Sequence, residues 1–82
     1  MTTDVTRLEE AIAKQIKVEL VERGLDQKEL AERIGIHPVT LTKYMKGQRS
    51  MPMPTFFAVA DALGLSPREL MTRAEARVQA ED

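Results

Sequence analysis

Apolar residues recur at intervals of three or four along most of the chain, and no segment alternates apolar and polar residues as a strand would. This spacing is typical of amphipathic helices, each with one face turned toward a core. The pattern predicts helices over residues 4–23, 27–34, 38–46 and 54–63, the last beginning at Pro54 or Thr55, and a fifth from residue 67. Residues 48–53 are expected to form a loop and residues 79–82 a frayed tail.

The first predicted helix carries the longest apolar stripe. Its core-facing positions are Val5, Leu8, Ile12, Ile16 and Leu20. Two valines beside this stripe, Val18 and Val21, are expected to widen it. The acidic residues of this helix are interpreted as a solvated face rather than an acid–base pair: Glu9, Glu10, Glu19 and Glu22.

Glycines and prolines mark the ends of the predicted helices. Each of the four glycines follows an apolar-periodic segment, where a left-handed residue commonly ends a helix. Three prolines fall where a first helical turn would begin. Asp26 with Glu29, and Ser66 with Glu69, have the spacing of capping boxes.

The third and fourth helices each supply bulky side chains to the core. Leu41, Tyr44 and Met45 are expected on the buried side of the helix over residues 38–46. Phe56 and Phe57 are adjacent, so both cannot face the same core. The second phenylalanine is expected either at a subunit contact or sheltered under the last helix.

Length and composition exclude several kinds of site. Eighty-two residues make one small domain with a modest core. The chain has no cysteine and one histidine, His37, so thiol chemistry and a multi-histidine metal site are excluded, and no cofactor or small-molecule substrate is predicted. No stretch approaches the about 20 apolar residues that span a membrane, so a cytoplasmic protein is expected. No catalytic motif is present, so the sequence predicts no enzyme.

Charge is distributed unevenly along the chain. The net charge is −1, but residues 33–60 contain four basic and no acidic residues, while the remainder has eight basic and thirteen acidic ones. The basic residues of this acid-free segment are Arg33, Lys43, Lys46 and Arg49. A local basic block attracts polyanions even in an acidic protein, although an uneven helical surface is an ordinary alternative.

Residues 27–46 hold the most informative spacing. Two short helices are joined by the turn over residues 35–37, and so short a connection forces them to cross steeply. Ala31 lets the two helices approach closely, Gly35 can adopt the left-handed conformation, and Leu41 fills the angle between them. The second helix would then project toward a major groove about 12 Å wide.

This segment resembles the helix-turn-helix of the Cro and lambda-repressor-like (XRE) family, over about residues 8–72. Where the family often has a serine before the recognition helix, this chain has His37. The resemblance implies an all-α, compact five-helix lambda-repressor-like DNA-binding domain over residues 1–82, with the helix-turn-helix at the second and third helices. The matching positions are Gln27, Leu30-Ala31, Gly35-Ile36, the helix over 38–46, Gly47, Gln48-Arg49, Pro52 and the segment 60–67.

The same resemblance implies two classes of DNA contact. Base contacts are expected from the exposed side of the recognition helix, at Pro38, Val39, Thr42 and Lys43. Partial burial of Val39 against the second helix and a pure phosphate contact for Lys43 remain alternatives. Phosphate contacts are expected from Gln27, His37, Thr40, Lys46, Gln48 and Arg49.

The leading hypothesis is a sequence-specific regulator of transcription that binds double-stranded DNA, most often as a repressor of phage or bacterial type. A homodimer on inverted half-sites is expected. The dimer interface would fall to the last helix, to an exposed apolar part of the first, or to contacts assisted by DNA. The alternative is a protein-interaction module, such as an antitoxin that binds a toxin or a polymerase subunit through its first or fifth helix.

Overall fold

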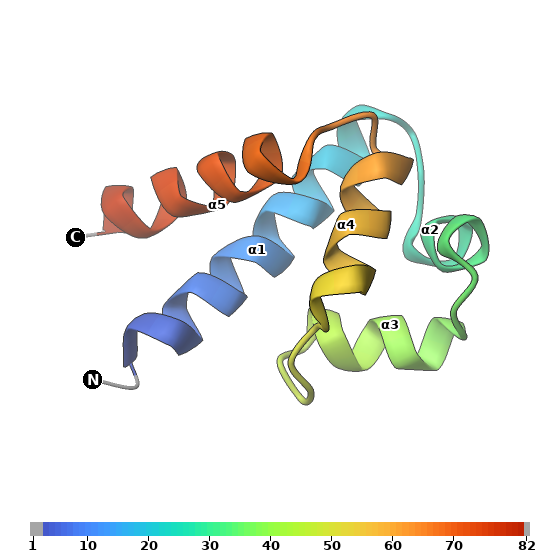
Figure 1. Ribbon diagram of the computed structural model, residues 1–82, viewed down its shortest axis with the longest axis horizontal. Coiled ribbons are helices and arrows are strands. Elements are labelled where there is room, and N and C mark those ends of the chain that lie inside the picture. Colours follow the sequence, from blue (N-terminus) through green and yellow to red (C-terminus); the bar gives the residue numbers. More distant parts are fainter. Residues whose placement is uncertain (1–2, 82) are drawn as a thin grey trace.

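The long helix α1 lies alongside α5 and also packs against α3, whereas α2 packs against α3 and α4 on the other side of the molecule (Figure 1). The computed structural model describes residues 3–81, and within that range all regular structure is helical. The five helices are α1 (Thr3–Glu22), α2 (Gln27–Ile34), α3 (Pro38–Met45), α4 (Met53–Ala62) and α5 (Pro67–Glu81). The all-α, five-helix prediction is confirmed.

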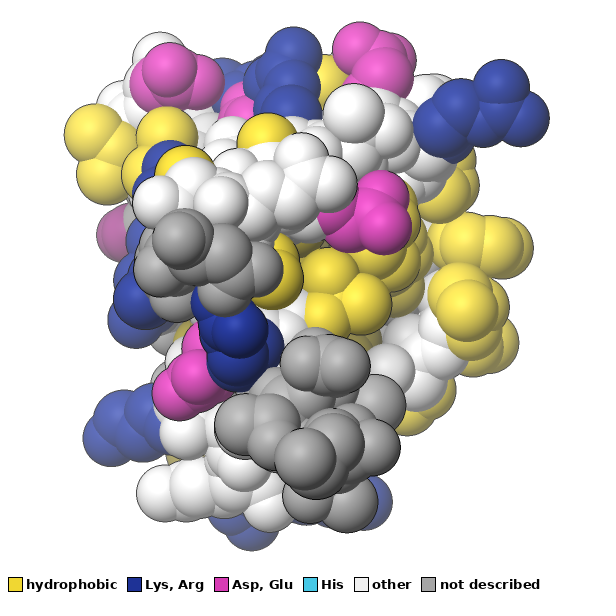
Figure 2. Space-filling model, turned by 90° about the vertical axis from the view of Figure 1, so that its left-hand side faces the viewer, with side chains coloured by type: hydrophobic (Ala, Val, Ile, Leu, Met, Phe, Trp, Pro, Cys, Tyr) yellow, Lys and Arg dark blue, Asp and Glu magenta, His cyan; other side chains and the backbone are white. Residues whose placement is uncertain are grey.

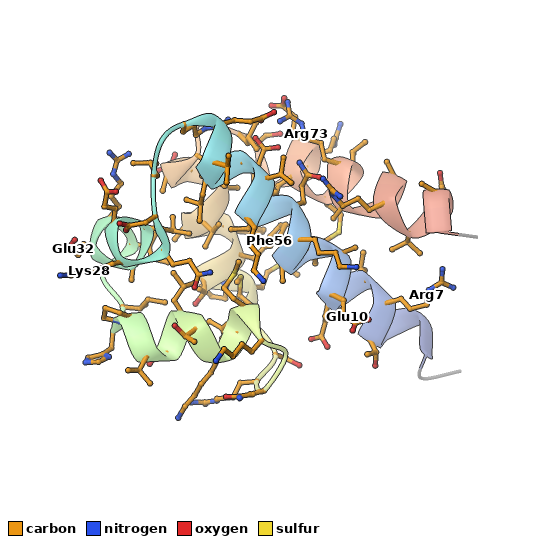
Figure 3. All side chains as sticks on the ribbon, turned by 180° about the vertical axis from the view of Figure 1, so that it is seen from behind. Arg7, Glu10, Lys28, Glu32, Phe56 and Arg73 are labelled. Atoms are coloured by element: carbon orange, nitrogen blue, oxygen red, sulfur yellow. The ribbon has the colours of Figure 1, made fainter. Side chains whose placement is uncertain are left out.

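A single hydrophobic cluster joins all five helices. Its fully buried members include Ile16 of α1, Leu30 of α2, Leu41 of α3, Val59 of α4 and Leu70 of α5. Phe56 also lies inside the fold, where it is labelled in Figure 3. The core thus holds α3 in place through its inward side chains and leaves its other face outside.

The turn between α2 and α3 has the form that the sequence predicts. Gly35 has φ +75° and ends α2 in the left-handed region, where a residue with a Cβ is strained. Its neighbour Ile36 donates its backbone N–H to Ala31 O at 3.0 Å, which closes the end of the helix. In Figure 1 α2 is viewed nearly end-on while α3 lies across the view, so the two helices cross steeply.

The capping boxes are confirmed at both predicted positions. Asp26 Oδ1 accepts the Glu29 backbone N–H at 2.8 Å, and Glu29 Oε1 accepts the Asp26 N–H at 3.2 Å. Ser66 and Glu69 make the same reciprocal pair at the start of α5, at 3.0 and 3.3 Å. Each box satisfies amides that a helix start would otherwise leave unpaired.

Several helix ends differ from the prediction, those of α1 and the end of α4 by one residue each. Helix α4 begins at Met53, inside the predicted loop, because Pro54 fits the first turn, where its missing N–H is not needed. Helix α3 ends at Met45, one residue early, with Lys46 as its C-cap. The backbone of α5 is helical through Glu81, so three of the four residues expected to fray lie in a helix, while Asp82 lies outside the described residues.

The buried face of α1 was predicted wrongly in part. Val18 and Val21 do not widen the stripe, because they are 36% and 79% exposed. Glu19 does not belong to a solvated face, because only 1% of it is exposed. Val5 lies outside the residues whose side chains are described. The face that α1 turns to α5 is partly polar, which a purely apolar periodicity does not reveal.

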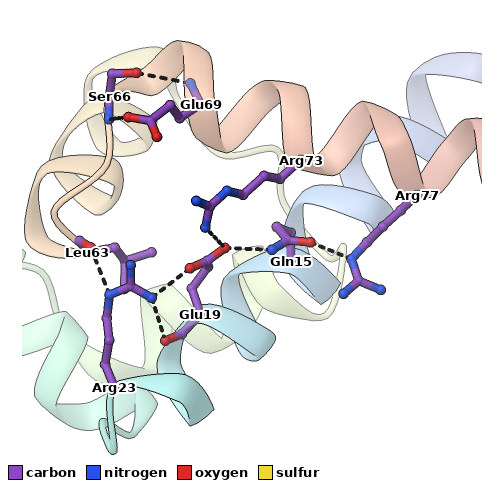
Figure 4. Close-up of polar contacts among 8 residues, drawn as sticks. All are labelled: Gln15, Glu19, Arg23, Leu63, Ser66, Glu69, Arg73 and Arg77. Carbon is purple, nitrogen blue, oxygen red and sulfur yellow. Dashed lines mark hydrogen bonds and ion pairs between the residues drawn. The ribbon is translucent and has the colours of Figure 1, made fainter.

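Glu19 and Gln15 form the centre of a polar network between α1 and α5 (Figure 4). Arg73 of α5 donates to Glu19 Oε2 at 2.7 Å, and Arg77 donates to Gln15 Oε1 at 2.6 Å. Gln15 in turn donates to Glu19 Oε2 at 2.6 Å, and Arg23 donates to Glu19 Oε1 at 2.6 Å. The network lets the two helices bury a carboxylate with all its polar atoms paired.

The ionisation of Glu19 follows from these contacts. Burial is the largest single influence and by itself raises the pKa of this carboxyl. Hydrogen bonds from Arg73, Gln15 and Arg23 together outweigh burial, so the pKa of Glu19 lies below its ordinary value. The hydrogen bond to Glu19 likewise raises the pKa of Arg73. Glu19 is therefore an ionised anchor for α5 at neutral pH.

Candidate nucleic-acid interface

Helix α3 has one buried and one exposed side. Leu41 and Met45 are buried and fix its rotation against the core, with Tyr44 half-buried beside them. The opposite side presents Val39, which is 55% exposed, and the exposed side chain of Lys43. Both residues are therefore open to a partner, although part of the Val39 side chain is covered.

His37 begins α3 in the place where the family often has serine. Its Nδ1 accepts the backbone N–H of Val39 at 3.1 Å, so the imidazole acts as the N-cap. Because Nδ1 is an acceptor, the hydrogen-bond pattern assigns the proton of the neutral ring to Nε2. The exposed ring therefore has an N–H donor left for an anion, which is what a phosphate contact requires.

Thr42 has less freedom than its residue type suggests. Its hydroxyl donates to the carbonyl oxygen of Pro38 one turn earlier, at 3.0 Å. In this rotamer Thr42 can accept a hydrogen bond from a base edge but has no proton left to donate. Thr42, Pro38 and Thr40 are each half-buried, so they offer smaller contact surfaces than Val39 or Lys43.

The loop after α3 continues the exposed basic surface. Lys46, Gln48 and Arg49 are all exposed, and the segment from residue 33 to residue 60 contains no carboxylate side chain. Gln48 donates its backbone N–H to Lys43 O at 2.9 Å, which folds the loop back on the end of α3. The three side chains therefore follow directly from the exposed face of α3.

The start of α2 is less open to anions than the sequence suggests. The half-buried Gln27 is the first residue of α2, next to the capping box of Asp26 and Glu29. Two amides at this end are already paired with carboxylates, whose charge repels phosphate. Further along α2, Lys28 and Glu32 both point outward, so its outer face is mixed in charge (Figure 3). Any phosphate contact here falls to the Gln27 side chain.

The structure thus brings most of the predicted contact residues onto α3 and the two ends that flank it. In the described part of the chain, no three histidine, cysteine or acidic side chains come together where they could hold a metal ion. Within residues 3–81 no helix is both long enough and apolar enough to cross a membrane. What the geometry offers is an exposed helix side that carries Lys43 and no carboxylate of its own, which suits a polyanion, while Lys46 and Arg49 at its end lie close to acidic residues of α1.

Comparison with known proteins identifies the family. A family model described as helix-turn-helix matches residues 10–70. The chain belongs to this XRE-type helix-turn-helix family. The family is one of DNA-binding transcriptional regulators, and the resemblance to the Cro and lambda-repressor-like (XRE) family is confirmed.

Solved structures of another helix-turn-helix protein share this fold. Two crystal structures of the clp gene regulator ClgR from Corynebacterium glutamicum superpose with TM-scores of 0.83 and 0.76, at 23% and 24% identity. The first match covers 90% of this chain and 79% of that one, and the second covers 85% and 91%. At this level of identity the likeness is one of fold.

A curated relative is similar in sequence over a short segment. The replication factor C small subunit of Thermococcus kodakarensis (strain ATCC BAA-918 / JCM 12380 / KOD1) is 32% identical over 62 residues. Those residues make up 76% of this chain but only 7% of that protein. The chain therefore spans a small part of the curated relative it matches.

Proposed function

We propose that this helix-turn-helix protein is a sequence-specific regulator of transcription that binds double-stranded DNA and acts as a repressor. The observation that carries the proposal is the exposed surface of α3 and the loop after it, which contribute basic side chains and no carboxylate. Helix α3 enters the major groove and the flanking residues bind the DNA backbone. An occupied operator then blocks access of RNA polymerase.

The chemistry of the exposed side chains indicates which of them would contact bases and which would contact phosphates. Lys43 reaches guanine O6 and N7, while Val39 and Pro38 contact thymine methyl groups. Thr42 accepts a hydrogen bond from an adenine or cytosine amino group, since its own proton is bound to Pro38 O. Base contacts select the operator sequence. Phosphate contacts supply register and affinity, from Gln27, His37, Thr40, Lys46, Gln48 and Arg49.

The interaction-module alternative explains less of the surface. A domain that binds only a protein partner through α1 or α5 does not require an acid-free surface on α3 and the following loop. An autoregulating antitoxin would need both surfaces, so it shares the DNA-binding prediction. Replacing Thr42 and Lys43 together separates the two hypotheses, because only the DNA binder loses operator binding.

The test is selection of bound sequences from a random duplex pool, followed by sequencing. The expected result is an inverted repeat whose half-site centres lie about 10 base pairs apart. Repression is then tested with a reporter gene placed behind the selected operator. An unenriched pool, with binding lost at moderate salt, would leave only backbone electrostatics and refute sequence-specific binding.

A further inference from the structure

The backbone amides at the start of α3 are largely occupied within the protein. Pro38 has no N–H, and the N–H of Val39 donates to His37 Nδ1 at 3.1 Å. The N–H of Leu41 donates to the carbonyl oxygen of His37 at 3.2 Å. Few amides therefore remain at this helix start to bind an anion directly. A DNA phosphate that approaches it is left with the exposed imidazole of His37 as its partner.

The imidazole can make two hydrogen bonds at the same time. Its Nδ1 accepts from Val39, and its Nε2, on the other side of the ring, carries the proton that a phosphate oxygen would accept. Donation to an anion increases the electron density on the opposite nitrogen, as it does in metal-bound histidines paired with carboxylates. A phosphate bound at Nε2 therefore strengthens the hydrogen bond that holds Val39.

The turn that His37 caps carries side chains that are expected to contact bases. Val39, whose amide is held by the ring, is 55% exposed. Thr42 is joined to the same turn, because its hydroxyl donates to the carbonyl oxygen of Pro38 at 3.0 Å. A phosphate contact at His37 is thus connected to the expected base contacts through two hydrogen bonds of one helical turn.

His37 lies at the opposite end of α3 from the basic residues of the following loop. In Figure 1 the start of α3, next to α2, is at the right and its Met45 end is at the left. Figure 2 is viewed from that left-hand side: Lys and Arg side chains reach its lower edge, and no histidine is visible among the described side chains drawn there. Contacts of Lys46 and Arg49 with the DNA backbone therefore fix the far end of α3, not its first turn.

We propose that His37 is a positioning residue for base recognition: its neutral imidazole binds a DNA phosphate through Nε2 and thereby tightens the Val39 cap that orders the first turn of α3. The inference rests on the proposed function, because its ligand is the phosphate backbone of the operator. A simple phosphate contact would add affinity without changing sequence preference. A simple cap would stabilise the helix equally with and without DNA.

Three substitutions separate the two hydrogen bonds of the ring. His37→Asn keeps a good capping acceptor but lacks the outer donor, His37→Gln keeps an outer donor but caps poorly, and His37→Ala lacks both. Each is expected to lower affinity for the selected operator about tenfold, because each bond depends on the other. Independent bonds would instead give two smaller losses whose logarithms add up to the loss in His37→Ala. That additive result overturns the proposal.

Sequence preference supplies a second measurement, with Lys46→Ala as the matched control. The ratio of affinity for the operator to affinity for a random duplex is expected to fall in all three His37 variants. In Lys46→Ala the ratio is expected to stay unchanged, because Lys46 follows the last turn of α3 and its phosphate contact is separate from the first turn. An unchanged ratio in the His37 variants makes His37 an ordinary phosphate contact and overturns the proposal.

The protonation of the ring can be measured directly in the wild-type chain, so this test needs no folded variant. Long-range proton–nitrogen NMR spectra of the operator complex are expected to show the proton on Nε2 and none on Nδ1. A proton on Nδ1 refutes the link, because Nδ1 could then not accept from Val39. A wild-type chain that enriches no operator refutes the proposed function and this inference with it. Specific binding with additive losses refutes only the role of His37.

Discussion

At the scale of single residues, exposed side chains at α3 are expected to play different roles in DNA binding. Lys43 lies on α3 itself, while Lys46 caps the end of that helix. Both are exposed lysines of the same charge, separated by one helical turn. Substitution of one or the other can therefore separate recognition of DNA bases from electrostatic attraction to the DNA backbone.

Lys43→Ala is expected to relax sequence preference at one base pair of each half-site, at a cost of about 1–3 kcal/mol on the preferred operator. Lys46→Ala is expected to weaken all sequences to a similar degree and to reduce the salt dependence by about one phosphate contact per subunit. Competition binding against single-base operator variants at several salt concentrations measures both. If Lys43→Ala weakens all operators equally, Lys43 is a phosphate contact instead.

At this scale, the sequence predicts an interaction correctly where both partners lie close together in the chain. The capping partners of Asp26 and Ser66 lie three residues away, so their spacing alone predicts them. The role of Glu19 depends on Arg73, 54 positions later, and no periodicity in α1 reveals that partner. The paired hydroxyl of Thr42 depends on its rotamer, which composition and spacing do not determine.

At the scale of elements, the turn between α2 and α3 determines whether the recognition helix projects. Gly35→Ala is expected to lower stability by about 1–2 kcal/mol, because its φ of +75° strains any L side chain while no other atom crowds the site. Gly35→Asn is the matched control and should cost less, since asparagine tolerates this region better. Thermal unfolding of the three chains measures the difference, and equal melting temperatures for Ala and Gly would contradict the argument.

The polar network between α1 and α5 is expected to make the stability of the fold depend on pH. Because folding lowers the pKa of Glu19, its contribution is complete above the ordinary value of 4.5 and is lost as pH falls through the lowered folded pKa. Glu19→Gln is expected to lower Tm by about 5 °C or more at neutral pH, with the gap to wild type closing in acid. Melting curves from pH 7 to 3 provide the measurement.

Glu10→Gln supplies the control for that series, because Glu10 also lies on α1 but is exposed. Its melting temperature should follow that of the wild type across the same range. A constant gap between wild type and Glu19→Gln at all pH values would mean that the carboxylate charge has no part in joining the helices.

The ends of helices are likewise predicted well where nearby residues determine them, and less well where the rest of the fold does. Helix α2 begins and ends where predicted, because a capping box and a left-handed glycine lie at its two ends. The start of α4 was missed because Pro52 and Pro54 both permit the extended and first-turn conformations. The exposure of Val18 and Val21 follows from which face of α1 receives α5, and that is decided by the whole fold.

At the scale of the whole molecule, the homodimer expected on an inverted repeat fixes the spacing of the two recognition helices. Inserting about 5 base pairs between the selected half-sites rotates one by half a turn of the duplex and should abolish joint binding, while about 10 base pairs should partly restore it. Mobility-shift titrations with the spaced operators measure this. Equal affinity at all spacings would mean that each subunit binds alone.

The half-buried Tyr44 lies on α3, and the chain has no tryptophan and no other tyrosine. Every photon of intrinsic emission excited near 280 nm therefore comes from one phenol on the proposed recognition helix. Addition of duplex DNA to the unlabelled chain should change that emission as α3 enters the groove. The molecule thus contains its own optical probe of DNA binding, which needs no dye and no added fluorophore.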